Sequence, residues 1–523
     1  MAERPQFFPN TLTPPTINAA TLASSLEELR IAVRNGAEQV KENTPLPESW
    51  GSHGIFRAFP GIALTFLRLD YQTSVLGDTK ETSLDYRQLG LQQVPSGLPE
   101  APLLPSRLSA IGSSSPVTAI TLRILAALAK DNWGNGKANI AVEDISCLLD
   151  AVQIALKNEP LVAHDGRKMG GDEILFGRAG LLWTLLNIRA HTFDEKTQTA
   201  LTPVLGKIPD IIRVIIDAGR QGSKSYINKN GDQEAHPLMY AWMEDHYCFG
   251  AVHGITGILT IILSAKPDEL AEHLPVIGDS ITALCKLSIS TNGHLPMTLP
   301  PFSYGQRSEL VQLCHGTPGL LILLAAALKN TALTRAHWDP SWDQAIYLGT
   351  ERVWEEGLLS KGGSLCHGIS GNAWPWLLLH NAFEYSSKNL DNGREAYLQR
   401  AQLLALPNAD VSQRLTGDSF LSRALAFMMH ARETRPYNTS TADPEKDYRM
   451  PDAPYALFEG LAGNVCAWAD TCAVLQAKLR KMELVEQGVC ATSGVPKDEA
   501  FQEALLKQIG FPALGGNGAT GLY

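Results

Sequence analysis

Two Cys-His-Gly sequences contain the residues of this chain that are best suited to chemistry. Cys314 and His315 occur in QLCHGTPG, and Cys366 and His367 occur in SLCHGIS. Zinc prefers thiolate and imidazole ligands, and a catalytic zinc site uses three protein ligands and leaves a fourth position open. A single Cys-His pair would more often reflect chance or core packing, but two matching pairs favour a metal. They predict one catalytic zinc, with either His315 or His367 as its nitrogen ligand.

A histidine and two carboxylates are candidates for proton transfer. His253 lies in FGAVHGITG, directly before a glycine that begins another turn. Histidine can act as an acid or a base near neutral pH, although a lone histidine is more often a capping or core residue. Asp172 and Glu173, in GGDEILFGRAG, could orient His253 or a reacting water. Acidic residues near helix starts usually cap the helix or face solvent, and the residues alone favour that interpretation here.

These motifs lie on the turns of an internal repeat. Each copy has small residues three apart, followed by about ten mostly apolar residues that favour a buried helix. The copies begin at Ala58, Gly112, Gly177, Gly254, Gly316, Gly368 and Gly460. Because strand signals are scarce and fully apolar helices belong in the interior, the pattern predicts an all-α barrel with seven inner helices and seven more polar outer helices.

The small residues of each turn have two expected tasks. The first glycine would let the chain turn with a positive φ, and the second would let the inner helix start close beside its neighbours. Every inner helix would then begin at the same end of the barrel. Seven positive helix N-termini would face one mouth, which suits anions and thiolates.

The rest of the chain is expected to fit around this barrel in one domain, residues 1–523, with insertions near 71–107 and 385–452. Four prolines between 95 and 105 predict that the first insertion is a long surface loop. The second contains a helical piece, LSRALAFMMHA, and a polar loop. Both are expected to be insertions in the domain rather than linkers between domains.

Composition excludes several classes of partner. The 523 residues carry a formal net charge of -10, which disfavours nucleic acid because its binding requires Lys and Arg against phosphates. The start, MAERPQFFPNTLTPP, has no apolar core of a secretory signal, and no segment approaches the roughly 20 apolar residues of a membrane helix. Eight cysteines are too few for a disulfide framework. We expect a cytoplasmic protein without integral membrane association.

Four motifs together resemble the LanC-like family, the eukaryotic relatives of bacterial lanthionine cyclases: GxVHGxxG, LCHGTPG, LCHGISGN and LFEGLAGN. The resemblance extends from Gly51 to Asp470. It implies an (α/α)7 toroid with seven inner and seven outer helices and one zinc at its mouth. The zinc ligands that it implies are Cys314, Cys366 and His367.

The same resemblance implies roles for other residues. His253 would be the general acid or base, Glu173 its carboxylate, and His315 a residue beside the metal or a catalytic one. The eukaryotic relatives resemble glutathione-binding proteins, and the basic positions associated with glutathione fall on Arg4, Lys361 and Arg449. Cations near the metal would hold the two carboxylates of glutathione while its sulfur reaches the zinc.

The function implied is that of a zinc-dependent glutathione transferase. Zinc would stabilise the thiolate, the thiolate would attack the β-carbon of dehydroalanine or dehydrobutyrine in a peptide or protein, and His253 or His315 would protonate the α-carbon. One alternative is a zinc- and glutathione-binding scaffold or sensor without turnover. A second alternative is a glycosidase, which normally needs two carboxylates where these turns offer one acidic cluster.

Overall fold

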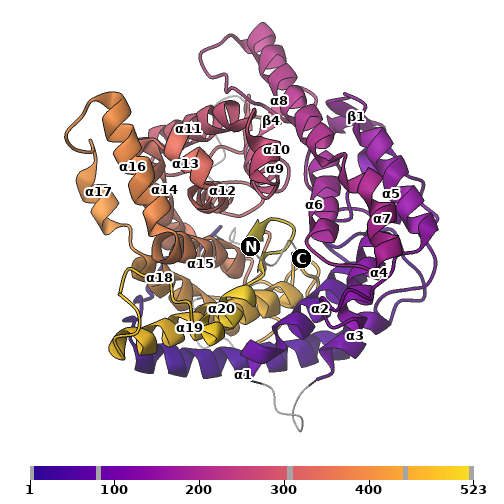
Figure 1. Ribbon diagram of the computed structural model, residues 1–523, viewed down its shortest axis with the longest axis horizontal. Helices are drawn as coiled ribbons and strands as arrows, with labels where there is room; N and C mark the ends of the chain where they lie inside the picture. The colour runs from indigo at the N-terminus through magenta and orange to yellow at the C-terminus, as the bar shows by residue number, and fades with distance from the viewer. Residues whose placement is uncertain (1–4, 78–83, 303–309, 440–445, 517–523) are drawn as a thin grey trace.

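The computed structural model describes residues 5–77, 84–302, 310–439 and 446–516. In these residues seven largely buried helices form an inner ring (Figure 1). They are α2 (Phe59–Leu76), α4 (Pro116–Lys130), α6 (Arg178–Arg189), α9 (Ile255–Ile262), α12 (Thr317–Lys329), α15 (Ile369–Tyr385) and α19 (Leu461–Glu486). Each packs against the next, and α19 packs against α2, so the ring is closed.

A second set of helices surrounds the inner ring. Within the described residues they are α1 (Ala19–Asn43), α3 (Tyr86–Gln92), α5 (Val142–Ala155), α8 (Ile208–Asn230), α11 (Leu274–Ser290), α14 (Pro340–Glu356) and α18 (Gly417–His430). Each packs against at least one inner helix that neighbours it in sequence. The chain therefore forms the predicted α/α toroid, and the long helix α1 lies along α19 at the join (Figure 1).

The remaining helices lie outside this double ring or between its members. They are α7 (Glu195–Leu205), α10 (Pro267–Leu270), α13 (Thr331–His337), α16 (Ser387–Ala401), α17 (Ala409–Arg414), α20 (Glu499–Leu506) and the 3-10 turns η1 (Pro105–Arg107) and η2 (Ala431–Glu433). None of the described helices is by itself long and apolar enough to cross a membrane. The pair α12 and α13 reaches that length together, with a bend of 98° between its halves.

The turns that precede the inner helices, here called the rim turns, are joined to one another by backbone hydrogen bonds. Around the described ring these bonds run Phe56 N to Ile111 O (2.8 Å), Gly112 N to Leu175 O (2.8 Å), Ile174 N to Val252 O (3.4 Å), Ala251 N to Leu313 O (3.3 Å), Cys314 N to Cys366 O (3.2 Å), Cys366 N to Phe458 O (2.8 Å) and Phe458 N to Phe56 O (3.2 Å). Because the series returns to its start, all these turns lie at one end of the ring. Residues on different rim turns are thereby held at fixed separations.

The second glycine of the repeat lets five of the inner helices, α2, α6, α9, α15 and α19, pack on their own rim turns. A Cβ added to Gly371 would lie 1.8 Å from the Leu365 carbonyl oxygen, and one on Gly257 would lie 1.8 Å from that of Ala251. The predicted task of the first glycine is wrong at most positions, since φ is −134° at Gly254. Of the glycines that precede α6, α9, α12, α15 and α19, Gly316 has a positive φ, +124°. The first glycines are required because a Cβ there would clash with neighbouring backbone, as at Gly254, where it would lie 2.2 Å from the Cys248 carbonyl oxygen.

We expect Gly371→Ala to destabilise the fold strongly because the new methyl group would overlap the backbone of the rim turn that carries two candidate ligands. The expected loss in the free energy of unfolding is about 3 kcal/mol, measured by denaturant titration. Gly488→Ala is the comparison, since its φ is +70° but its Cβ would meet no atom within 4 Å. It should cost about 1 kcal/mol. Equal losses in the two variants would contradict the close packing at Gly371.

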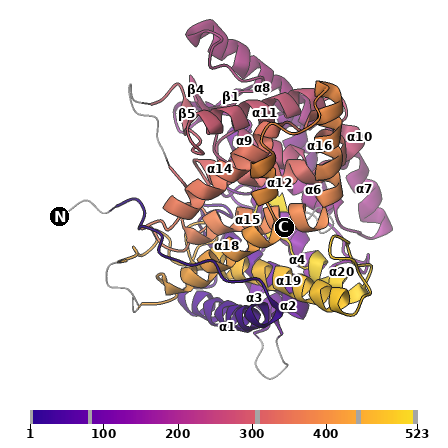
Figure 2. The ribbon, with the colours of Figure 1, turned by 90° about the vertical axis from the view of Figure 1, so that its left-hand side faces the viewer.

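A small antiparallel sheet, which the sequence did not predict, lies beside the rim. Its five strands are β1 (Leu161–His164), β2 (Arg167–Gly170), β3 (Ala241–Met243), β4 (His246–Cys248) and β5 (Thr298–Leu299), paired in that order. They come from the connections that lead into α6, α9 and α12. The sheet therefore joins three connections and lies above one part of the toroid's edge (Figure 2).

The C-terminal segment enters the ring, where β6 (Gly510–Phe511) and β7 (Gly515–Gly516) pair (Figure 1). The side chains of Arg68 and Asp470 are fully buried there. Arg68 donates a 2.6 Å hydrogen bond to the Gly510 oxygen. Asp470 accepts from the backbone nitrogens of Ile509 (3.0 Å) and Gly510 (2.8 Å). A buried charge pair thus holds the segment by its backbone, and Phe511 packs on Trp374 of α15.

Both predicted insertions contain parts of the ring. In 71–107 the chain first completes α2 and then forms α3, so the prediction of a long surface loop is wrong there. In 385–452 the apolar piece LSRALAFMMHA belongs to α18, the outer helix that packs against α15. Both stretches contain an outer helix because the chain needs one each time it runs back from the end of an inner helix to the rim. The additional helices in this region are α16 and α17, which pack on α13 and α14.

Candidate metal centre

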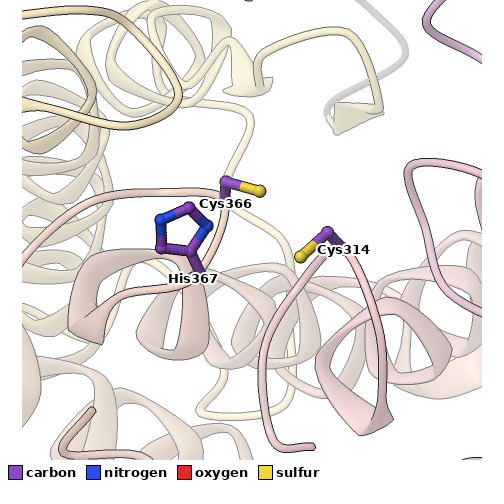
Figure 3. Close-up of side chains that lie close together, drawn as sticks. All are labelled: Cys314, Cys366 and His367. Atoms are coloured by element: carbon purple, nitrogen blue, oxygen red, sulfur yellow. The ribbon is translucent and has the colours of Figure 1, made fainter. Parts of the chain in front are cut away.

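Three of the predicted ligands converge on one point of the rim. Cys314 directly precedes the turn into α12, and Cys366 and His367 precede α15 (Figure 3). Their ligand atoms all lie within 4.8 Å of one another, and among the described residues no other group of three such side chains does. The cysteines are 6% and 5% exposed. The sequence left His315 and His367 as equal candidates, and it is His367 that completes this group, here called the triad.

The triad has the electrostatics of a site for a soft divalent cation. The hydrogen bond from the Cys366 thiol, together with one from His367, holds the pKa of Cys314 well below its usual range. The same contact, with burial, holds the pKa of Cys366 well above it. Gln312 adds a hydrogen bond from Nε2 to the Cys314 sulfur, at 3.2 Å. A buried thiolate, a second thiol and an imidazole match the donors that zinc prefers.

The two neighbouring carboxylates before α6 have different partners. Glu173, whose side chain is 1% exposed, pairs with Nδ1 of His253. Asp172 instead accepts two hydrogen bonds from Arg178, at 2.7 Å from Nε and 3.0 Å from a terminal nitrogen. The interpretation of Glu173 as a capping or solvated acid is therefore wrong. Asp172 anchors the start of α6, while Glu173 fixes the ring of His253 and leaves Nε2 available.

His253 and His315 form an aromatic group with a residue that the sequence did not identify. Their ring centroids are 5.8 Å apart with an interplanar angle of 24°. Trp242 of β3 stacks on His253 at 4.6 Å and lies 5.3 Å from His315. Nδ1 of His315 is 3.9 Å from the Cys248 sulfur, and burial lowers the pKa of His315. Both histidines are thus held beside the triad, with His315 favoured in its neutral form.

Lys361 and Arg449 line one cavity of about 340 Å³. The N-terminal segment closes its side, because Ser360 N donates to Gln6 O at 3.0 Å and Arg449 N donates to Ser360 O at 2.9 Å. Gln312 also lines the cavity and connects it to Cys314. The volume is within the usual range of small-molecule sites. The third predicted cation, Arg4, lies outside the described residues.

Comparison with known proteins agrees with this architecture. Residues 49–414 match the family model described as lanthionine synthetase C-like protein. Glutathione S-transferase LANCL1 of Danio rerio is 26% identical over 474 residues, which cover 89% of this chain and 92% of the relative. LanC-like protein GCL1 of Arabidopsis thaliana is 26% identical over 317 residues, which cover 60% of this chain and 58% of the relative.

A solved structure of nisin cyclase also matches, with 13% identity and a TM-score of 0.34 over 87% of this chain and 98% of that one. That likeness is too low to support an argument. The assignment depends instead on the family model, which matches well over half of the residues. This chain therefore belongs to the lanthionine synthetase C-like protein family.

Proposed function

We propose that this protein binds one zinc ion through Cys314, Cys366 and His367 and adds the thiol of glutathione to dehydroalanine or dehydrobutyrine residues of peptides or proteins. The product is a thioether. The observation that carries the proposal is the placement of a thiol-imidazole triad beside a histidine whose ring is fixed by a buried carboxylate. The name of the Danio rerio relative, a glutathione S-transferase, supports the choice of thiol.

Zinc at the triad would supply stabilisation of the glutathione thiolate near neutral pH. In the addition, a bond forms from sulfur to the β-carbon, the π electron pair moves to the α-carbon, and the α-carbon takes a proton. His253 is suited to deliver that proton through Nε2, because Nδ1 is held by Glu173. The Glu173 carboxylate stabilises the protonated ring before transfer and fixes its orientation. The thiol loses one proton and the α-carbon gains one, so the net reaction neither consumes nor releases a proton.

The cavity beside the triad is the proposed position of glutathione. Lys361 and Arg449 would bind its two carboxylates, with Arg4 as a third cation. Gln312 lines this cavity and also donates a hydrogen bond to Cys314, so it is the link between the cavity and the triad. The proposal thus assigns the thiol to the side of the rim formed by the turns before α12, α15 and α19.

We expect Arg449→Ala to raise the KM for glutathione by about 10- to 100-fold, the effect of losing a charged hydrogen bond. The zinc content should not change, because Arg449 is not in the triad. Steady-state kinetics at varied glutathione concentration measure the effect. The matched control is Arg213→Ala, which removes an arginine that is 57% exposed on the outer helix α8. A fall in kcat at an unchanged KM would contradict this position for glutathione.

The proposed function is tested by incubating the purified protein with glutathione and a dehydroalanine peptide and analysing the peptide by mass spectrometry. The expected result is a glutathione adduct that forms faster than without protein. Bound zinc and bound glutathione without adduct would instead identify the non-catalytic scaffold. A glycosidase is disfavoured because the two described carboxylates before α6 are each engaged, Glu173 by His253 and Asp172 by Arg178.

A further inference from the structure

The small sheet gathers an aromatic cluster beside His253 from residues that do not line the proposed glutathione cavity. Trp242 lies on β3, and Phe302 follows β5, with their ring centroids 5.6 Å apart in an edge-to-face arrangement. The ring centroids of His246, on β4, and Phe302 are 4.3 Å apart. The strand pairing Tyr247 to Leu299 holds β4 against β5, so these residues from separate connections meet. The sheet thereby adds the aromatic ring of Phe302 to the stack of His253 and Trp242.

This cluster leaves apolar surface uncovered. Phe302 is 43% exposed, and it is the one aromatic side chain among the exposed large hydrophobic residues that the structure describes. Trp242 is half-buried, between the exposed ring of Phe302 and the ring of His253. Exposed aromatic rings beside a reactive histidine are typical of a surface that binds a ligand.

We propose that Trp242 and Phe302 form an acceptor platform, which binds an apolar or aromatic side chain next to the dehydroamino acid of a peptide acceptor. The inference rests on the proposed function and adds which acceptors the same site prefers. The acceptor class is therefore a peptide with an apolar neighbour beside the reacting residue, in preference to a small free electrophile.

The separation of the rings carries this assignment. For His253 to protonate the α-carbon, that carbon must lie close to the His253 ring. Adjacent Cα atoms of a peptide are about 3.8 Å apart. A residue next to the reacting one is therefore within reach of Trp242, whose ring centroid lies 4.6 Å from that of His253. Its side chain would contact Trp242 and, one ring further, Phe302. The cations Lys361 and Arg449 line a different cavity, so thiol and acceptor would approach the triad separately.

The test compares two dehydroalanine peptides that differ only in the residues flanking dehydroalanine, Phe in one and Ser in the other. With glutathione saturating, kcat/KM is measured for the full chain and for Phe302→Ala. We expect the parent to prefer the Phe-flanked peptide, and Phe302→Ala to lower that preference about three- to tenfold, the effect of one aromatic contact. Phe302→Leu should restore part of the preference because it restores apolar surface. Trp242 is less suitable for this test because it also contacts His253.

The matched control is Leu404→Ala, which removes the most exposed large hydrophobic side chain described and should leave the preference unchanged. A parent that reacts with both peptides equally, or a Phe302→Ala protein that keeps the parent's preference, would overturn the acceptor platform and leave the proposed function intact. A parent that modifies neither peptide would reject the proposed function, and the platform with it.

Discussion

Replacing Cys366 with alanine should remove bound zinc and thioether formation together. Cys366 supplies one of the three donor atoms of the triad, and only one thiol and one imidazole would then lie close together. Loss of even an outer partner of a metal ligand costs about 10- to 100-fold in affinity or activity. We therefore expect zinc to fall from one per chain to below about a tenth of that value, and adduct formation to fall by more than about 100-fold.

Elemental analysis of the purified protein and mass spectrometry of the peptide product measure the two quantities. Cys490→Ala is the matched control, because Cys490 is a half-buried free thiol in the connection after α19 and belongs to no described metal-ligand group. It should retain zinc and activity. Thermal unfolding of both variants separates loss of the ligand from loss of the fold. A Cys366→Ala protein that kept stoichiometric zinc would show that the metal is held elsewhere.

The inner ring could be predicted from the sequence because its determinants are local. A glycine is needed wherever an inner helix touches the carbonyl group of its own rim turn, as at Gly257 and Gly371, and the apolar run follows directly. Repetition then implies a ring. The prediction of a positive φ at the first glycine was wrong at Gly254 because spacing does not distinguish a conformational need from a steric one.

The triad was partly predictable for the same reason, since its cysteines occupy matching places in successive repeats. The choice between His315 and His367 required the resemblance or the structure, because both histidines follow a cysteine in the same way. Glu173 could not be distinguished from Asp172 by position alone. The partner of each depends on which direction its side chain takes at the rim, toward His253 or toward Arg178.

Trp242 was missed because its position depends on pairing between distant segments. The strands that hold it have two to four residues, too few to give an alternating pattern, and they come from three separate connections. Such pairing is fixed by the toroid, which brings these connections to the same part of the rim. The sequence therefore predicted the side chains of the candidate site and left out the surface beside them.

The second large effect is expected for His253→Ala, which should lower kcat by about 10²- to 10⁴-fold, the usual contribution of a positioned general acid or base. Zinc content and glutathione affinity should stay close to those of the parent, since His253 is in neither the triad nor the cavity lined by Lys361. Steady-state kinetics, elemental analysis and glutathione titration measure the three quantities. This combination separates loss of proton transfer from loss of the metal.

Two further variants show whether the effect belongs to the Glu173–His253 pair. Glu173→Gln keeps a polar group against Nδ1 but removes the charge that stabilises the protonated ring, so it should lower kcat less than His253→Ala does. His53→Ala is the control, because His53 is an exposed histidine near the turn into α2 and should leave kcat unchanged. If His253→Ala lowered kcat by less than about tenfold, His253 would not be the main proton donor. His315, whose ring lies 5.8 Å away, would then be the group to replace, and Glu173→Gln should have little effect on kcat.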